Sequence, residues 1–233
     1  MSAERKPLIM ECSNTMKRAG WLSAMLACAV MPHASAVTYG FAAITSNSAV
    51  DAGTAGQYSV DVTDASSGGV NIAEFTFRNA GPLQSTIGQI YFQDGTLLGI
   101  SSILNGPGGV SFQLTATPMS LPAGMDASPP FVTTKSFDTS AISPAPFNGV
   151  NPGEFVSIFF NLINGKTFAD TIAAITSGDL RFGIHVINFG DGKSESFVGP
   201  GTPGTSVPDA ASTLLLLAMG LGGIVAFRKK VLA

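Results

Sequence analysis

The chain has 233 residues, and charged residues make up 12% of it, about half of the roughly 25% found in soluble domains. Its 27 glycines, 14 prolines and 16 phenylalanines indicate short strands joined by many turns. Twelve acidic and five basic residues lie between positions 37 and 206, which gives this central part a formal charge of −7. A nucleic-acid-binding protein needs a cationic surface to displace counterions from phosphates. We therefore expect no nucleic-acid partner.

The first 36 residues have the layout of a secretory signal peptide. A pair of basic residues precedes an apolar run at residues 21–31, and Ala34 and Ala36 form an A-x-A cleavage site. The apolar run has only eleven residues, whereas a membrane-spanning helix needs roughly 20. We therefore expect cleavage after Ala36 rather than an uncleaved anchor.

Two details of the signal region affect the mature chain. Met16 stands directly before the basic pair, which suggests that translation starts there. Cys28 raises the alternative of a lipoprotein, but residues 25–27 match poorly the pattern that precedes a lipidated cysteine. Cleavage after Ala36 would remove both Cys12 and Cys28, and the mature chain would then hold no disulfide and no cysteine metal ligand.

Between residues 37 and 198 the main pattern is an alternation of apolar and polar residues, which indicates half-buried strands. In the strand expected at residues 156–162, one face is apolar, and Phe155 and Phe159 lie on the opposite face. This predicts a central strand covered on both sides. The clearest expected strands are residues 58–63, 110–115 and 156–162.

Breaks in the alternation predict a bulge and several turns. Val70 and Ile72 lie on the opposite face from the two phenylalanines that follow them, which predicts a β-bulge near Ala73 and Glu74. Four Asp-Gly or Asn-Gly pairs separate apolar runs, and glycine there is expected to supply the positive φ of tight turns. These pairs begin at Asp94, Asn105, Asn148 and Asn164.

About 160 residues of short strands predict a single antiparallel β-sandwich with jelly-roll-like connections. Apolar residues recur at helical spacing at residues 167–176, which predicts one short helix. Two proline-rich loops, residues 118–130 and 143–152, are expected to cross between sheets or to decorate an edge. The sequence contains no visible repeat of 20–50 residues, which argues against a solenoid or a propeller. Residues 199–206 hold only glycine, proline, serine and threonine, which is typical of a flexible spacer.

The last 27 residues, 207–233, contain an apolar segment with a basic end. As a helix, residues 210–227 would span about 27 Å, close to the roughly 30 Å of a hydrocarbon core. Basic residues favour the cytoplasmic side, which places the large domain outside that membrane. The alternatives are a permanent C-terminal anchor and a buried core helix. The basic residues are Arg228, Lys229 and Lys230.

Val207, Pro208 and Asp209 directly precede this helix, and the order of motif, helix and basic end resembles PEP-CTERM sorting signals, most closely the VPDSG-CTERM variety. The chain departs from that pattern at Ala210 and Ala211, where the family carries Ser-Gly. The resemblance implies that an exosortase, a membrane cysteine protease, cuts near the motif after a transient stay in the inner membrane. It also implies export to the cell envelope or extracellular space of a bacterium that makes exopolysaccharide.

Residues with catalytic or metal-binding potential are few. His185 would be the only histidine left after cleavage, and it shares a strand face with Arg181 on which polar residues normally meet solvent. A surface or structural role is therefore predicted for His185. Zinc-ligand spacing, a G-x-S-x-G elbow and a phosphate-binding loop are absent from the sequence, so we expect no catalytic residue, metal or cofactor.

Calcium has two weak candidates in the sequence. Asp61 and Asp64 flank one turn, and Asp191, Gly192 and Glu195 form one acidic loop. Neither group matches the D-x-[DN]-x-[DN]-G series of calcium loops. We therefore expect these carboxylates to be solvated.

The function predicted from the sequence is that of an exported, exosortase-sorted, non-enzymatic protein of the cell surface or extracellular matrix, associated with exopolysaccharide. A polysaccharide-binding module is the first alternative. Loss of Trp21 leaves only three tyrosines for sugar stacking, and most phenylalanines occupy expected core positions. A glycan hydrolase is the second alternative, and it needs two carboxylates about 5 to 9 Å apart.

Overall fold

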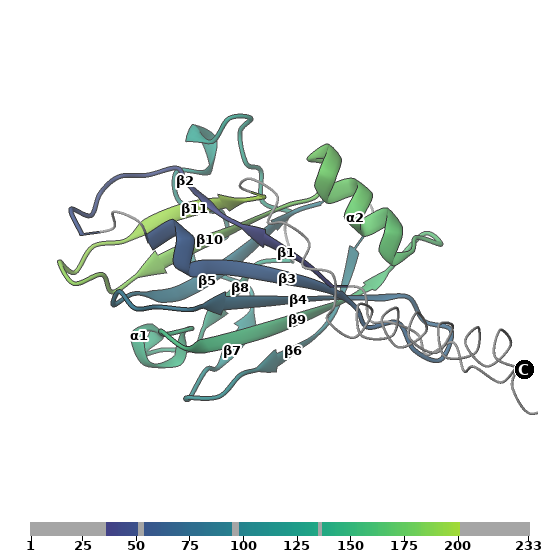
Figure 1. Cartoon of the computed structure of the whole chain (residues 1–233), viewed down its shortest axis with the longest axis horizontal. Helices are drawn as coiled ribbons and strands as arrows, with labels where there is room; N and C mark the ends of the chain where they lie inside the picture. Colours follow the sequence, from purple (N-terminus) through teal and green to yellow (C-terminus); the bar gives the residue numbers. More distant parts are fainter. Residues whose placement is uncertain (1–35, 51–53, 95–97, 135–136, 201–233) are drawn as a thin grey trace, which may run out of the picture. The chain divides into compact units, whose positions relative to one another are not determined.

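A computed structural model describes residues 36–50, 54–94, 98–134 and 137–200, which form two antiparallel β-sheets (Figure 1). The five-stranded sheet has the order β1 (Ala36–Gly40), β3 (Tyr58–Asp64), β4 (Ile72–Asn79), β9 (Glu154–Leu162), β6 (Leu98–Asn105). The six-stranded sheet has the order β2 (Ala42–Ala43), β11 (Glu195–Gly199), β10 (Arg181–Ile187), β5 (Thr86–Gln93), β8 (Thr139–Ala141), β7 (Phe112–Leu114). The predicted β-rich fold with antiparallel strands is therefore confirmed.

Aromatic rings from both sheets form the centre of the core. Phe92 of β5 lies 5.2 Å from Phe75 and 5.7 Å from Phe77, both in β4, measured between ring centroids. It also lies 4.8 Å from Phe160 of β9. Phe182 of β10 contacts the same two rings of β4. Most of these rings meet edge to face, the arrangement that aromatic pairs prefer, and each ring is fully buried.

The predicted helix is confirmed as α2 (Phe168–Ser177). It begins with a capping box, in which the Thr167 hydroxyl accepts from the Asp170 amide and the Asp170 carboxylate accepts from the Thr167 amide. It ends at Gly178, whose φ of 84° is one that glycine adopts without strain. Ile175 faces inward, so the helix contributes to the same core.

Three short helical turns complete the described secondary structure: η1 (Thr54–Gln57), η2 (Gly124–Asp126) and α1 (Ala145–Asn148). The last of these lies in the predicted proline-rich loop at residues 143–152. This loop joins β8 in one sheet to β9 in the other, so it crosses between sheets as expected. The other proline-rich loop, residues 118–130, joins β7 to β8 within one sheet.

The predicted β-bulge near Ala73 and Glu74 is wrong. Strand β4 keeps an unbroken register with both of its neighbours, β3 and β9. The change of phase arises because the strand starts only at Ile72, while Val70 lies in the preceding turn with half of its surface exposed. Two other sites carry register shifts, between Ile100 and Ser102 in β6 and between His185 and Val186 in β10.

The expected strand at residues 110–115 is shorter than predicted, because β7 covers only Phe112–Leu114 and Thr115 has a φ of 74°. The turn expected at Asp94 and Gly95 is not a hairpin, since β5 and β6 belong to different sheets; residue 95 lies outside the described residues.

Of the three Asn-Gly glycines, only Gly165 has the expected positive φ. Gly149 has a φ of −81°, and a Cβ there would lie 2.4 Å from a methyl group of Thr86. A Cβ on Gly106 would lie 2.0 Å from the carbonyl oxygen of Phe155. These two glycines are therefore needed for close packing rather than for an unusual backbone conformation.

We expect Phe92→Ala to lower the free energy of unfolding by about 3–5 kcal/mol, because it removes a fully buried ring that joins both sheets. Phe147→Ala is the matched control, since 73% of the Phe147 surface is exposed, and it should change stability by less than about 0.5 kcal/mol. Urea unfolding of the full chain measures both values. Equal effects of the two substitutions would contradict this packing.

Candidate functional site

The residues predicted to direct sorting lie almost entirely outside the described residues. These are Ala34 of the signal cleavage site, the motif Val207, Pro208 and Asp209, and the basic residues Arg228, Lys229 and Lys230. Ala36 is described: it is the exposed first residue of β1 and pairs with Thr63. Within the described ranges, no helix is long and apolar enough to cross a membrane. The helix expected at 210–227 falls beyond them, and these site assignments stay predictions.

The chain leaves the described structure at the end of a well-packed strand. Strand β11 includes Gly199, one residue beyond the predicted domain end at 198. A Cβ on Gly199 would lie 2.3 Å from the ring of Phe182, so this glycine packs directly against the core. Residues 200–206 alone separate this strand from Val207.

The acidic loop considered for calcium instead holds a neighbouring segment of the chain. The buried carboxylate of Glu195 accepts hydrogen bonds from the Thr45 hydroxyl and from the backbone amides of Asn47 and Ser48. Asp191 accepts at 3.0 Å from the Ser48 hydroxyl and at 3.0 Å from the amide of residue 49. The two carboxylates therefore fix residues 45–49 against the loop between β10 and β11.

The surroundings of Asp191 favour its charged form. Desolvation, the largest single influence, raises its pKa, but the hydrogen bonds donated by Lys193, Ala49 and Ser48 together lower it below the ordinary value. At the other candidate, Asp61 pairs with Arg78 and Asp64 accepts from the Ser66 amide. Across the part of the chain that the structure describes, no group of three His, Cys, Asp or Glu side chains is placed to hold a metal ion.

His185 has a structural position on the outer side of the six-stranded sheet. Its Nδ1 faces the side-chain oxygen of Gln89, whose amide nitrogen donates to the carbonyl of Thr117 at 2.8 Å. Nδ1 therefore carries the proton in this arrangement, because the Gln89 oxygen can only accept. Burial lowers the pKa of His185, and the nearby Glu195 carboxylate partly opposes that effect.

The outer side of the six-stranded sheet is covered by a segment that we call the cover segment, residues 116–134. Leu121 and Phe131 of this segment pack with Tyr91 and Val198 in a second apolar cluster. Arg181 was predicted to face solvent, but only 7% of its surface is exposed.

Polar side chains of the sheet hold the backbone of the cover segment. The Arg181 guanidinium donates to the carbonyl oxygens of Pro129 and Pro130 at 3.0 and 3.1 Å, and lies 5.5 Å from the Phe131 ring centroid. The Tyr91 hydroxyl donates to the carbonyl of Pro118 at 2.9 Å. The exposed face expected from the alternation of Arg181 and His185 is thus an internal contact.

The outer side of the five-stranded sheet is different, and we call it the open face. Most of its residues are partly or fully exposed, although Thr76 and Ser157 at its centre are buried, and two phenylalanines project from β9 on this side. Phe155 and Phe159 are half-buried and Ser157 between them is buried, so the outer side of β9 is covered only in part, less than the prediction of a strand covered on both sides. The open face consists of Thr38, Ser59, Asp61, Thr63, Glu74, Thr76, Arg78, Ser102, Leu104, Phe155, Ser157 and Phe159.

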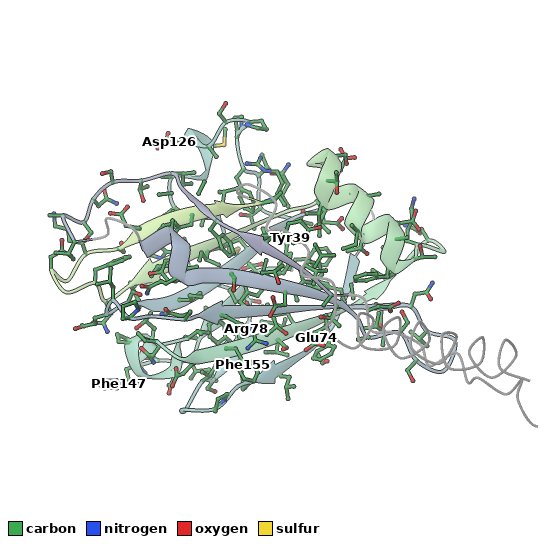
Figure 2. The ribbon with its side chains drawn as sticks, viewed as in Figure 1. Tyr39, Glu74, Arg78, Asp126, Phe147 and Phe155 are labelled. Atoms are coloured by element: carbon green, nitrogen blue, oxygen red, sulfur yellow. The ribbon has the colours of Figure 1, made fainter. Side chains whose placement is uncertain are left out.

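Charged and aromatic groups lie beside one another on the open face, as Figure 2 shows for Arg78, Phe155 and Glu74. The Arg78 Nε donates to the Asp61 carboxylate at 2.7 Å, and the guanidinium carbon lies 5.1 Å from the Phe155 ring centroid. The hydroxyl of Thr38 donates to the other oxygen of Asp61 at 2.6 Å. This arrangement combines aromatic surface, a cation and acceptors, the set of groups that a hydroxyl-rich ligand needs.

Comparison with known proteins identifies the C-terminal region. Residues 206–231 match the VPDSG-CTERM motif, a C-terminal sorting signal of the PEP-CTERM type. This motif suggests that the protein is exported and sorted to the cell surface. No curated protein and no solved structure matches the chain.

We expect Glu195→Gln to lower the free energy of unfolding by about 1–3 kcal/mol, because the new amide nitrogen cannot accept the hydrogen bonds that the lost oxygen received. Asp126→Asn removes the same charge from an exposed position and should change stability by less than about 0.5 kcal/mol. Urea unfolding of the full chain compares them. A Glu195 variant as stable as the Asp126 variant would contradict the anchoring role of Glu195.

Stability should also depend on pH through His185. Because its folded-state pKa lies below the unfolded value of about 6.5, the unfolded chain binds more protons in the window just below pH 6.5. The contribution of neutral His185 is fully present above pH 6.5 and is lost as the pH falls toward the folded-state pKa. Urea unfolding between pH 7.5 and 5 should show a steeper loss for the wild type than for His185→Gln. Parallel profiles would show that His185 has no such effect.

Proposed function

We propose that the chain is an exosortase substrate that becomes a non-enzymatic component of the cell surface or extracellular matrix. The observation that carries the proposal is the VPDSG-CTERM match at residues 206–231, which stands at the end of the chain after a β-rich region. Export would use the signal peptide at residues 1–36, with cleavage after Ala36. The helix at 210–227 would then hold the protein in the inner membrane until processing.

The spacing of the C-terminal elements supports this route. The seven residues 200–206 between β11 and the motif can extend to about 23 Å, which lets a membrane protease reach the motif without unfolding β11. Arg228, Lys229 and Lys230 would stay on the cytoplasmic side. Ala210 and Ala211 replace the family's Ser-Gly, so this chain suits an exosortase that tolerates alanine there.

A structural role for the β-rich region is supported by how its polar side chains are used. Glu195 and Asp191 hold residues 45–49, and Arg181 and His185 hold or support the cover segment. Each of these side chains is therefore held in a hydrogen bond that it would have to give up in order to act in catalysis. The ring contacts between Phe92 and β4 support the single antiparallel β-sandwich expected from the sequence.

Association with exopolysaccharide is the part of the proposal that concerns the protein's final location. The open face supports it, because two half-buried phenylalanines and the hydroxyl groups of Ser59, Thr63 and Ser102 lie on its outer side. A glycan hydrolase remains the competing function, and it predicts the release of reducing ends from a polysaccharide substrate. Loss of that release on substituting one carboxylate would favour the enzyme.

We expect the protein isolated from its native host to lack residues 1–36 and the part of residues 207–233 beyond the cut, as measured by intact mass. Pro208→Ala and Asp209→Ala should leave full-length tails in the inner-membrane fraction, whereas Pro203→Ala in the spacer should be processed like the wild type. A surface-located protein with residues 207–233 intact would contradict the sorting proposal.

A further inference from the structure

We infer that the open face of the five-stranded sheet is a binding surface for a neutral polysaccharide. The inference rests on the proposed association with exopolysaccharide and names the part of the molecule that would make the contact. It depends on three observations: where aromatic rings project, which polar groups surround them, and what charge the surface carries.

The aromatic observation concerns β9. Phe155 and Phe159 occupy outward positions of this strand, four positions apart and therefore separated by roughly 13 Å at 3.3 Å per residue. The inward positions already carry Val156, Ile158 and Phe160, which are fully buried. The two outer rings are thus not required to fill the core. Rings in such a row can pack against the C–H faces of successive sugars in an extended chain.

The polar observation concerns the groups beside the rings. Arg78 uses Nε to bind Asp61, and this is the one hydrogen bond that its guanidinium makes among the described residues. With 46% of its side chain exposed, it has donors left for sugar hydroxyls. Glu74 pairs across the strands with Phe159 and accepts a bond from Thr76 at 3.2 Å through one oxygen. Donors and acceptors therefore flank both rings.

Charge decides which kind of polysaccharide fits. The open face carries two carboxylates, Asp61 and Glu74, and one cation, Arg78, and the whole segment from 37 to 206 has a formal charge of −7. The negative charge of the whole segment opposes the approach of a polyanionic polysaccharide. Asp61 is already paired with Arg78 and Thr38, which leaves little free negative charge to attract a polycation. A neutral polymer is not repelled by the negative charge and does not need free carboxylates for binding.

The other sheet does not offer an equivalent surface. Its outer side is occupied by the cover segment, where Phe131 and Leu121 pack on Tyr91. The tyrosines that the sequence offered for sugar stacking, Tyr39, Tyr58 and Tyr91, are all buried. The open face therefore holds the outward aromatic rings of the described strands.

Affinity electrophoresis of the full chain tests the inference directly. Native gels containing hydroxyethylcellulose or dextran, both neutral, are compared with gels containing alginate, a polyanion, and with gels lacking polysaccharide. We expect retardation by at least one neutral polymer and none by alginate. In the retarding gel, Phe159→Ala and Arg78→Gln should each weaken binding about tenfold, equivalent to about 1.4 kcal/mol. Phe147→Ala, an exposed phenylalanine outside the open face, should bind like the wild type.

Each result has a definite meaning. Equal weakening by Phe147→Ala and Phe159→Ala, or retardation that Phe159→Ala leaves unchanged, would overturn the open face as the site while leaving polysaccharide association in place. Absence of retardation by both neutral polymers, retardation by alginate alone, or a dimer that Phe159→Ala dissociates in gel filtration would overturn the inference. Processing at residues 207–209 is measured separately by intact mass, so failure of this binding leaves the sorting proposal untouched. Urea unfolding shows that each variant is folded.

Discussion

The phenylalanine rings between the two sheets are the contact on which the rest of the structure depends. Phe92 of β5 touches rings from both β4 and β9, and Phe182 of β10 touches the same rings of β4. Because cleavage after Ala36 would leave no cysteine, these contacts must stabilise the exported protein without help from disulfides. They also fix which residues point outward, because successive side chains of a strand point to opposite faces of the sheet.

Local patterns in the sequence predicted local structure. The strand at residues 58–63, the helix at 167–176 and the alternation in β9 were all predictable, because each depends on residues close together in the chain. Strand pairing was not, since partners such as Thr76 and Ser157 are 81 residues apart. The bulge expected near Ala73 was a misinterpretation of the two apolar residues before it, one of which lies in a turn.

The candidate sites show the same contrast between features formed by neighbouring residues and features formed by residues far apart in the chain. The sorting motif could be predicted because its residues are contiguous, and the comparison with known proteins agrees with it. The open face could not be predicted, because it joins outward residues of five strands. Arg181 illustrates the difficulty: its alternation indicates a solvent-facing side chain, but a segment some fifty residues away in sequence covers it and accepts its hydrogen bonds. Alternation reports which face a side chain is on, and only the complete fold determines whether that face is covered.

The two sheets thus differ in their outer sides: one is covered by the chain's own cover segment, and the other is the face that we propose for polysaccharide binding. Cleavage after Ala36 would remove Trp21, so a single tryptophan introduced into the chain from residue 37 onward would report only on its own position. The most direct measurement is the emission of a Phe159→Trp variant titrated with hydroxyethylcellulose and with dextran, beside a Phe147→Trp variant. A neutral polysaccharide on the open face predicts a saturable blue shift for position 159 and no change for position 147. No change at position 159 with either polymer, or equal changes at both positions, would contradict it.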